Sequence, residues 1–164
     1  MNMGKEGGRI LTAGLLNGFA GKTELNEIIQ DGFSFTTSSY VGSEGEYVDR
    51  WTGAGGQEVA RAKSGKMYTR LYGGGTLDMD KLNALGLSEK DVIGPNGVLV
   101  YFLKKLGDLT RLTEDMTMSD GKFTYNYNIT DTELGGRVLQ AKEWIDYDKE
   151  TTIFVHYFIL ALIK

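Results

Sequence analysis

The chain has a single histidine, His156, which is its most versatile acid–base side chain and lies in an apolar C-terminal segment. Two interpretations stay open for it: a buried, hydrogen-bonded histidine, or a polar group that reaches into a ligand cavity. Glu58 stands in an alternating segment and presents a similar choice. It is either a surface carboxylate paired with Arg50 or Arg61, or an acid inside a pocket, where it would be functional.

Aromatic side chains repeat at strand spacing in both halves of the chain, at Tyr47, Trp51, Tyr68, Tyr72, Tyr125 and Tyr127. Most such residues form a core or cross-strand pairs, but tyrosine and tryptophan also line pockets for apolar ligands. The expected ligand is a small apolar or aromatic molecule. The candidate ligand-binding residues are Tyr47, Arg50, Trp51, Glu58, Tyr72 and His156.

Composition excludes several other chemistries. The absence of cysteine removes disulfides, thiolate nucleophiles, iron–sulfur clusters and cysteine zinc sites, and it fits a reducing cytoplasm. One histidine cannot form a histidine metal cluster, although a Ser-His-Asp triad stays formally open. A net charge of −4 without a dense Lys/Arg run argues against a nucleic-acid surface. We therefore predict no metal, no cofactor and no nucleic-acid partner.

Two short motifs resemble known ion-binding loops and fail on spacing. Gly21-Lys22-Thr23 is similar to the end of a phosphate-binding loop, but Leu16 stands where that loop needs a glycine. A turn with Thr23 as a helix cap is the better interpretation. The acidic run at 146–150 starts like a calcium loop, yet it lacks the required glycine and final glutamate, so it predicts a hairpin turn.

Periodicity predicts an α+β order of elements. Helical spacing covers 9–19 and a short piece at 23–29, and it returns at 80–85 and from Pro95 to a terminator at Gly107. The last predicted strand is apolar on both faces, so we expect it in the middle of the sheet, under the helices and covered on both sides. The predicted strands are 33–40, 46–52, 57–63, 66–72, 109–118, 122–129, 137–145 and 151–162. Gly73-Gly74-Gly75 then forms a flexible strand end.

The second half of the chain echoes the first. The segment 56–63 can be laid over 135–142 without a gap, with glycine, valine, alanine and lysine in matching positions. This register places Arg137 against Glu58, so the second copy has lost that carboxylate and any site is biased toward the first copy. The echo predicts a sheet built from two related hairpin units, about 45–75 and 121–163.

These features predict one α+β domain over 1–164: a curved antiparallel β-sheet packed against N-terminal and central helices. No membrane segment is expected. The apolar run at 10–20 is diluted by polar residues, and the run at 153–163 is too short to span a bilayer as a helix. A cytoplasmic location is the corresponding prediction.

The segment 47–53, then Gly56-Gln57-Glu58-Val59 and Tyr72-Gly73-Gly74, resembles a small bacterial domain family of unknown function. Members of that family occur alone or behind a helix-turn-helix in transcriptional regulators. A helix with a Phe-Leu-Lys core follows in the family, as at 102–104 here, and the likeness covers about 30–164. The second copy departs from the family at Gly136 and Arg137, where an acidic pair is preferred. The resemblance does not by itself imply DNA binding, and the family has no known activity that could be carried over to this chain.

Three functions are compatible with these residues. The one we favour is a non-catalytic domain that binds or senses a small molecule in an aromatic-lined cavity. The second is a cavity enzyme of lyase, cyclase or isomerase type, with Glu58 or His156 as acid or base. The third is a protein-interaction module or homodimer, joined through a sheet edge or an exposed aromatic face.

Overall fold

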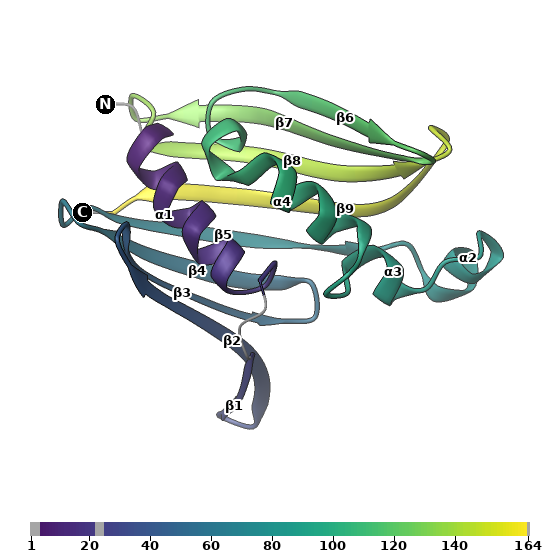
Figure 1. Ribbon diagram of the computed structural model, residues 1–164, viewed down its shortest axis with the longest axis horizontal. Helices are drawn as coiled ribbons and strands as arrows, with labels where there is room; N and C mark the ends of the chain where they lie inside the picture. The colour runs from purple at the N-terminus through teal and green to yellow at the C-terminus, as the bar shows by residue number, and fades with distance from the viewer. Residues whose placement is uncertain (1–3, 22–24, 164) are drawn as a thin grey trace.

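The computed structural model describes residues 4–21 and 25–163. They form a nine-stranded antiparallel sheet with the strand order β1-β2-β3-β4-β5-β9-β8-β7-β6, and helices pack on one of its faces (Figure 1). The two central strands, β5 and β9, come from different halves of the chain. The α+β, sheet-dominated fold predicted from the sequence is confirmed.

Each half of the chain contributes a helix and then a run of strands. The first half has α1 (Gly4–Asn17), β1 (Asn26–Gln30), β2 (Phe33–Gly42), β3 (Gly45–Thr52), β4 (Gly55–Ala62) and β5 (Met67–Thr76). Two short helices follow, α2 (Met79–Ala84) and α3 (Glu89–Ile93). The second half has α4 (Val98–Arg111), β6 (Met116–Asp120), β7 (Phe123–Glu133), β8 (Val138–Tyr147) and β9 (Thr151–Leu162).

Helices α1 and α4 lie side by side across the same face of the sheet (Figure 1). Their apolar stripes are buried against it, with Ile10, Leu11 and Phe102 fully inaccessible to solvent. Gly14 lets α1 approach closely, since a Cβ there would fall 2.2 Å from the ring of Tyr47. The main core therefore lies between the two helices and the sheet, and the candidate site lies within it.

The short helix predicted at 23–29 is wrong over its described part, which is strand β1. The signal that decides this is Asp31-Gly32, which joins β1 to β2 as a tight hairpin with both residues at positive φ. Thr23, the predicted cap of that helix, lies outside the described residues. Gly73-Gly74-Gly75 lies at the end of β5, as predicted, but it is regular strand that pairs with β9.

The strand predicted over 109–118 begins too early. Gly107 has a φ of 59° and interrupts the helical geometry, as expected for a glycine terminator. The chain then resumes a helical turn that ends at Arg111. Strand β6 starts only at Met116. This extra turn matters for the site, because it carries Asp108 and Arg111 onto the sheet.

Strand β9 lies in the middle of the sheet and under the helices, as predicted, but its second face is open. Tyr157 is 58% exposed and Ile159 is 49% exposed on the face away from the helices. The strand that is apolar on both faces is therefore central in the sheet, but only one of its faces is covered by helices.

The strands of the two halves occupy corresponding positions on either side of the sheet centre, although a repeat of hairpin units is not confirmed. Counting outward from the centre of the sheet, β5 corresponds to β9, β4 to β8 and β3 to β7. In this correspondence Glu58 matches Glu143, each in the middle of its strand. The predicted register, which set Glu58 against Arg137 and left the second half without that carboxylate, is wrong in space.

Candidate functional site

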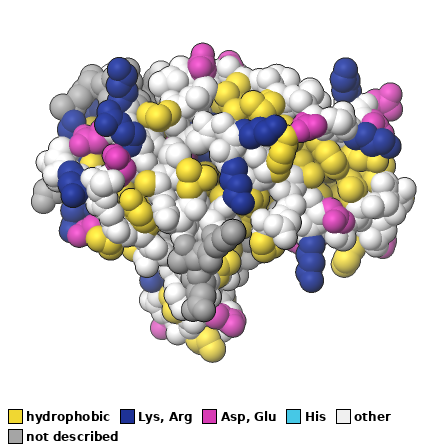
Figure 2. Space-filling view, viewed as in Figure 1, with side chains coloured by type: hydrophobic (Ala, Val, Ile, Leu, Met, Phe, Trp, Pro, Cys, Tyr) yellow, Lys and Arg dark blue, Asp and Glu magenta, His cyan; other side chains and the backbone are white. Residues whose placement is uncertain are grey.

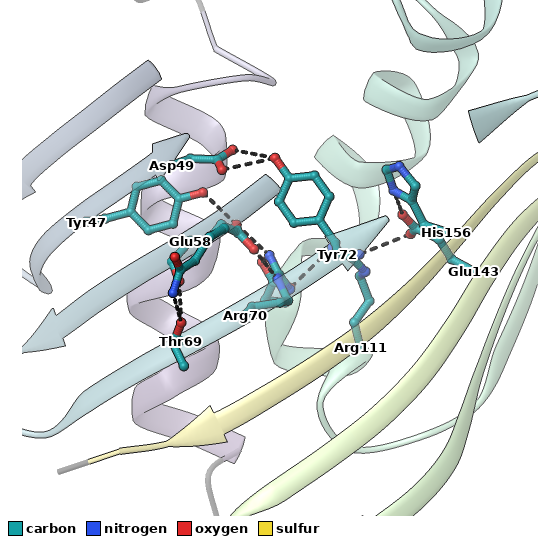
Figure 3. Close-up of polar contacts among 11 residues, drawn as sticks. Tyr47, Asp49, Glu58, Thr69, Arg70, Tyr72, Arg111, Glu143 and His156 are labelled. Carbon is teal, nitrogen blue, oxygen red and sulfur yellow. Dashed lines mark hydrogen bonds and ion pairs between the residues drawn. The ribbon is translucent and has the colours of Figure 1, made fainter. Parts of the chain in front are cut away.

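A first cross-strand row of buried polar residues runs over β3, β4 and β5. Asp49, Glu58 and Arg70 are direct register partners, and all three are at most 5% exposed (Figure 3). Arg70 donates to both oxygens of Glu58, the bond from Nη2 to Oε1 being 2.7 Å. Tyr47 donates its hydroxyl to Glu58 Oε1 at 2.6 Å. Both carboxylate oxygens of Glu58 are therefore committed to protein donors.

A second row occupies the matching place on β7, β8 and β9. Its members are Tyr127, Glu143 and His156, all buried. Glu143 accepts from Arg111 Nη2 at 3.0 Å and from the hydroxyl of Tyr125. His156 Nδ1 lies 3.2 Å from Glu143 Oε1. Each central glutamate thus receives one tyrosine and one arginine, but the third place holds arginine in one row and histidine in the other.

Asp108 of α4 joins the two rows. Its carboxylate accepts from Arg70 Nη1 and, at 3.2 Å, from Arg111 Nη1. The break at Gly107 positions it, because the freed Asp108 N–H donates to Thr12 Oγ1 of α1 at 2.6 Å. The result is a buried chain of alternating charge, from Glu58 through both arginines to Glu143.

Paired arginines favour the ionised forms of two carboxyl groups in this chain, Asp108 and Glu143. Burial works against the charge of Asp108, but Arg70 and Arg111 hold its pKa below the ordinary value. Burial likewise opposes the charge of Glu143, and Arg111 together with the hydrogen bond from His156 lowers its pKa to about 2. The chain holds three carboxyl groups against two guanidinium groups, so it has one more acidic group than arginines.

Asp49 is a buried carboxyl that has no arginine of its own. The hydroxyl of Tyr72 donates to its two oxygens at 3.0 and 3.3 Å. Burial, reinforced by the negative charge of Glu58, raises the pKa of Asp49 to about 8. The protonated form of Asp49 is therefore favoured at neutral pH, and a nearby positive charge would favour its anion.

A cavity of about 170 Å³ opens beside these rows, between the helices and the sheet. Its floor holds the buried residues of both rows, including Glu58, Arg70, Glu143 and His156. Its walls and rim are apolar and aromatic, from Leu15, Phe19, Trp51, Tyr72, Ile93, Leu99, Leu103, Phe154 and Phe158. A partly open, largely apolar space over a few polar groups is a common form of small-molecule site.

Two polar atoms that belong to this lining have no hydrogen-bond partner among the described residues: His156 Nε2 and Arg111 Nε. The guanidinium of Arg111 lies against aromatic faces, with its Cζ 5.2 Å from the ring centre of Phe158. His156 Nε2 is different. Ionised Glu143 can only accept, so Nδ1 must donate to it. In the tautomer that carries this proton alone, Nε2 is an acceptor.

The structure brings four of the six candidate residues from the sequence to the cavity: Trp51, Glu58, Tyr72 and His156. Tyr47 lies behind it and supports Glu58. Arg50 does not reach the cavity, because it is exposed on the other face of β3 and binds Gln30. The predicted surface pairing of Glu58 with Arg50 or Arg61 is wrong, since Glu58 is 3% exposed and pairs with Arg70.

Sequence reasoning missed Asp49, Arg70, Asp108, Arg111 and Glu143. A signal existed for two of them, because Arg70 alternates with the buried Tyr68 and the partly buried Tyr72 on one face of its strand. Glu143 stands in the same way between Ala141 and Ile145. A charged residue flanked at i±2 by core residues marks a buried charge.

A second hollow lies at the end of the molecule that carries α2 and α3, where hydrophobic side chains gather on the surface (Figure 2). It is wide and open, and it is lined by Leu87, Val98, Tyr101, Phe123 and Tyr147 among others. It lacks a buried ionisable group, so it offers less chemistry than the first cavity. No cluster of three or more potential metal ligands occurs within the described ranges.

Comparison with known proteins found no family model, no curated protein and no solved structure that matches this chain. The resemblance to the bacterial domain family therefore stays a prediction. Within residues 4–21 and 25–163, no helix has the length and apolar character needed to cross a membrane.

Proposed function

We propose that this protein is a binding or sensing domain that holds a small, largely apolar molecule in the cavity between its helices and the sheet. The observation that carries the proposal is the lining: aromatic walls around about 170 Å³, with the buried His156 Nε2 unpartnered in the described structure. A buried polar atom without a partner costs free energy, and a ligand that supplies one recovers it. A cavity of about 150 Å³ is large enough for benzene, so a single substituted ring fits.

The proposal is tested with benzyl alcohol as the probe and native mass spectrometry of freshly purified protein. We expect a 1:1 complex and a rise in the melting temperature with the alcohol. Leu99→Trp fills the cavity from α4 and should abolish both effects. Val100→Ile changes the neighbouring buried residue, which does not line the cavity, and should preserve them. Equal binding by wild type and Leu99→Trp would place the ligand elsewhere and overturn the proposal.

A second candidate function is acid–base catalysis in the same cavity. The favouring observation is the pairing of His156 with Glu143, because a carboxylate on one ring nitrogen orients the other as a proton acceptor. Glu58 does not suit that role, since Arg70 and Tyr47 occupy both its oxygens. A bound molecule whose NMR spectrum is unchanged after long incubation supports binding, and the appearance of a new chemical species supports catalysis. A cytoplasmic location remains part of the proposal.

A further inference from the structure

Among the described residues, the cavity lining has two acceptors with free hydrogen-bonding capacity and one unused donor, Arg111 Nε, whose guanidinium lies against aromatic rings. Arg70 and Tyr47 are spent on Glu58, and Tyr72 donates to Asp49. The acceptors that keep free capacity are His156 Nε2 and the Asp49 carboxyl, whose only side-chain donor within the described structure is Tyr72. In its ionised form a carboxyl group can accept about four hydrogen bonds. A ligand that donates therefore matches two of the three unused polar groups of this lining.

The charge of the site points the same way. The alternating chain already has one acidic group more than it has guanidinium groups, and Asp49 adds a negative charge when it ionises. Its neighbours are Glu58 on β4, Arg70 and Tyr72 on β5, and Tyr47 on its own strand, and the one cation among them is already paired. An anionic ligand would add to this excess, whereas a cation would cancel it.

The aromatic walls complete the match. Phe158 already has two guanidinium groups near its ring, with Arg70 Cζ at 5.5 Å and Arg111 Cζ at 5.2 Å. Trp51 and Tyr72 line the cavity with further aromatic surface. Aromatic faces attract cations, most strongly where water is excluded. The helices add apolar Leu15, Leu99 and Leu103, and Arg111 is paired with carboxylates.

We propose that the ligand carries a protonated nitrogen: the cavity takes a small aromatic or aliphatic ammonium ion, whose N–H groups bind the Asp49 carboxylate and His156 Nε2. This inference rests on the proposed function and specifies its ligand class. Binding needs Asp49 as an anion, and its protonated form is favoured at neutral pH. The ammonium ion therefore replaces a proton, which leaves for the solvent, and the affinity rises with pH.

The test compares three probes of one size by isothermal titration calorimetry: benzylamine, benzyl alcohol and benzoate. At pH 8 we expect benzylamine to bind roughly tenfold to hundredfold more tightly than benzyl alcohol, the gain typical of a charge-assisted hydrogen bond. Benzoate should be the weakest. Asp49→Asn should remove the preference for benzylamine and keep the binding of benzyl alcohol. Glu46→Gln, which removes an exposed carboxylate from the same strand, should change neither.

A second measurement needs no variant. Titration of benzylamine into wild type at pH 7 in phosphate and in Tris should show release of close to one proton, because the two buffers take it up with different enthalpies. Affinity should rise several-fold per pH unit between pH 6 and pH 8. If benzyl alcohol or benzoate binds at least as tightly as benzylamine, or no proton is released, the ammonium inference fails and the cavity proposal stands. If none of the three binds, both fail.

Discussion

The two buried rows differ at their third position, which is arginine in the first row and histidine in the second. This difference gives the first row a structural role and leaves the second row able to bind a ligand. In the first row Arg70 fills the third position, binds Glu58 through two nitrogens and leaves no free capacity on that carboxylate. In the second row His156 holds the same place and binds Glu143 through one nitrogen only. A permanently charged, five-donor arginine completes a network, whereas a histidine leaves one nitrogen over. The unused capacity of the cavity thus comes from the second half, together with Asp49 of the first.

The largest effect is expected from removing the arginine that distinguishes the first row. Arg70→Met leaves Glu58 without its guanidinium and Asp108 with one partner fewer, so the free energy of unfolding should fall by about 3–5 kcal/mol at pH 7. Urea denaturation measures it. Arg61→Met on β4 removes an exposed partner of Glu46 and should cost less than about 1 kcal/mol. A loss of the control's size in Arg70→Met would show that the first row is not supporting the fold.

The contribution of the second row to the free energy of unfolding should be lost at low pH. The pKa of Glu143 is lowered to about 2 in the folded protein, so its contribution is present above its ordinary pKa of 4.5 and is lost as the pH falls toward 2. Above pH 5 this amounts to about 3 kcal/mol. The difference in unfolding free energy between wild type and Glu143→Gln should shrink between pH 5 and pH 2. A constant difference over that range would contradict the pairing.

Asp49 should show the opposite pH dependence. Its pKa is raised to about 8, so the folded protein holds a proton that the unfolded chain has lost, and wild-type stability declines between pH 4 and pH 8. Asp49→Asn removes this titration. The stability of the variant relative to wild type should therefore increase with pH, by roughly 1 kcal/mol per unit between pH 5 and pH 7. A flat or falling difference would mean that Asp49 ionises freely in the folded protein.

The smallest expected effects on stability come from the tyrosines, and they test whether the two rows are equivalent at that position. Tyr47 and Tyr125 each donate to the central glutamate of their row. Tyr47→Phe and Tyr125→Phe should each cost about 1–2 kcal/mol, since each removes one hydrogen bond to a charged group and little volume. Urea denaturation of the two variants compares them directly. Costs that differ by more than about 2 kcal/mol would show that the two places are not equivalent.

The sequence was informative about local structure and less so about long-range pairing. Alternation and glycine turns predicted the central strands, and the tyrosine spacing led to Tyr72 at the cavity. The helical turn after Gly107 was invisible, because its apolar residues also fit a strand. Asp108 meets Arg70 across 38 positions of chain, so only the packing of α4 on the sheet brings them together. Glu143 was overlooked for the same reason: its partners come from other elements.

The central claim is that His156 offers its Nε2 to the cavity as an acceptor while Glu143 holds Nδ1. Because His156 is the only histidine, nitrogen-15 NMR of histidine-labelled protein reports on it without ambiguity. At pH 8 we expect the proton on Nδ1, an unprotonated Nε2, and a shift of the Nε2 resonance when benzylamine is added. A proton on Nε2, or a resonance that benzylamine leaves unchanged, would contradict the account.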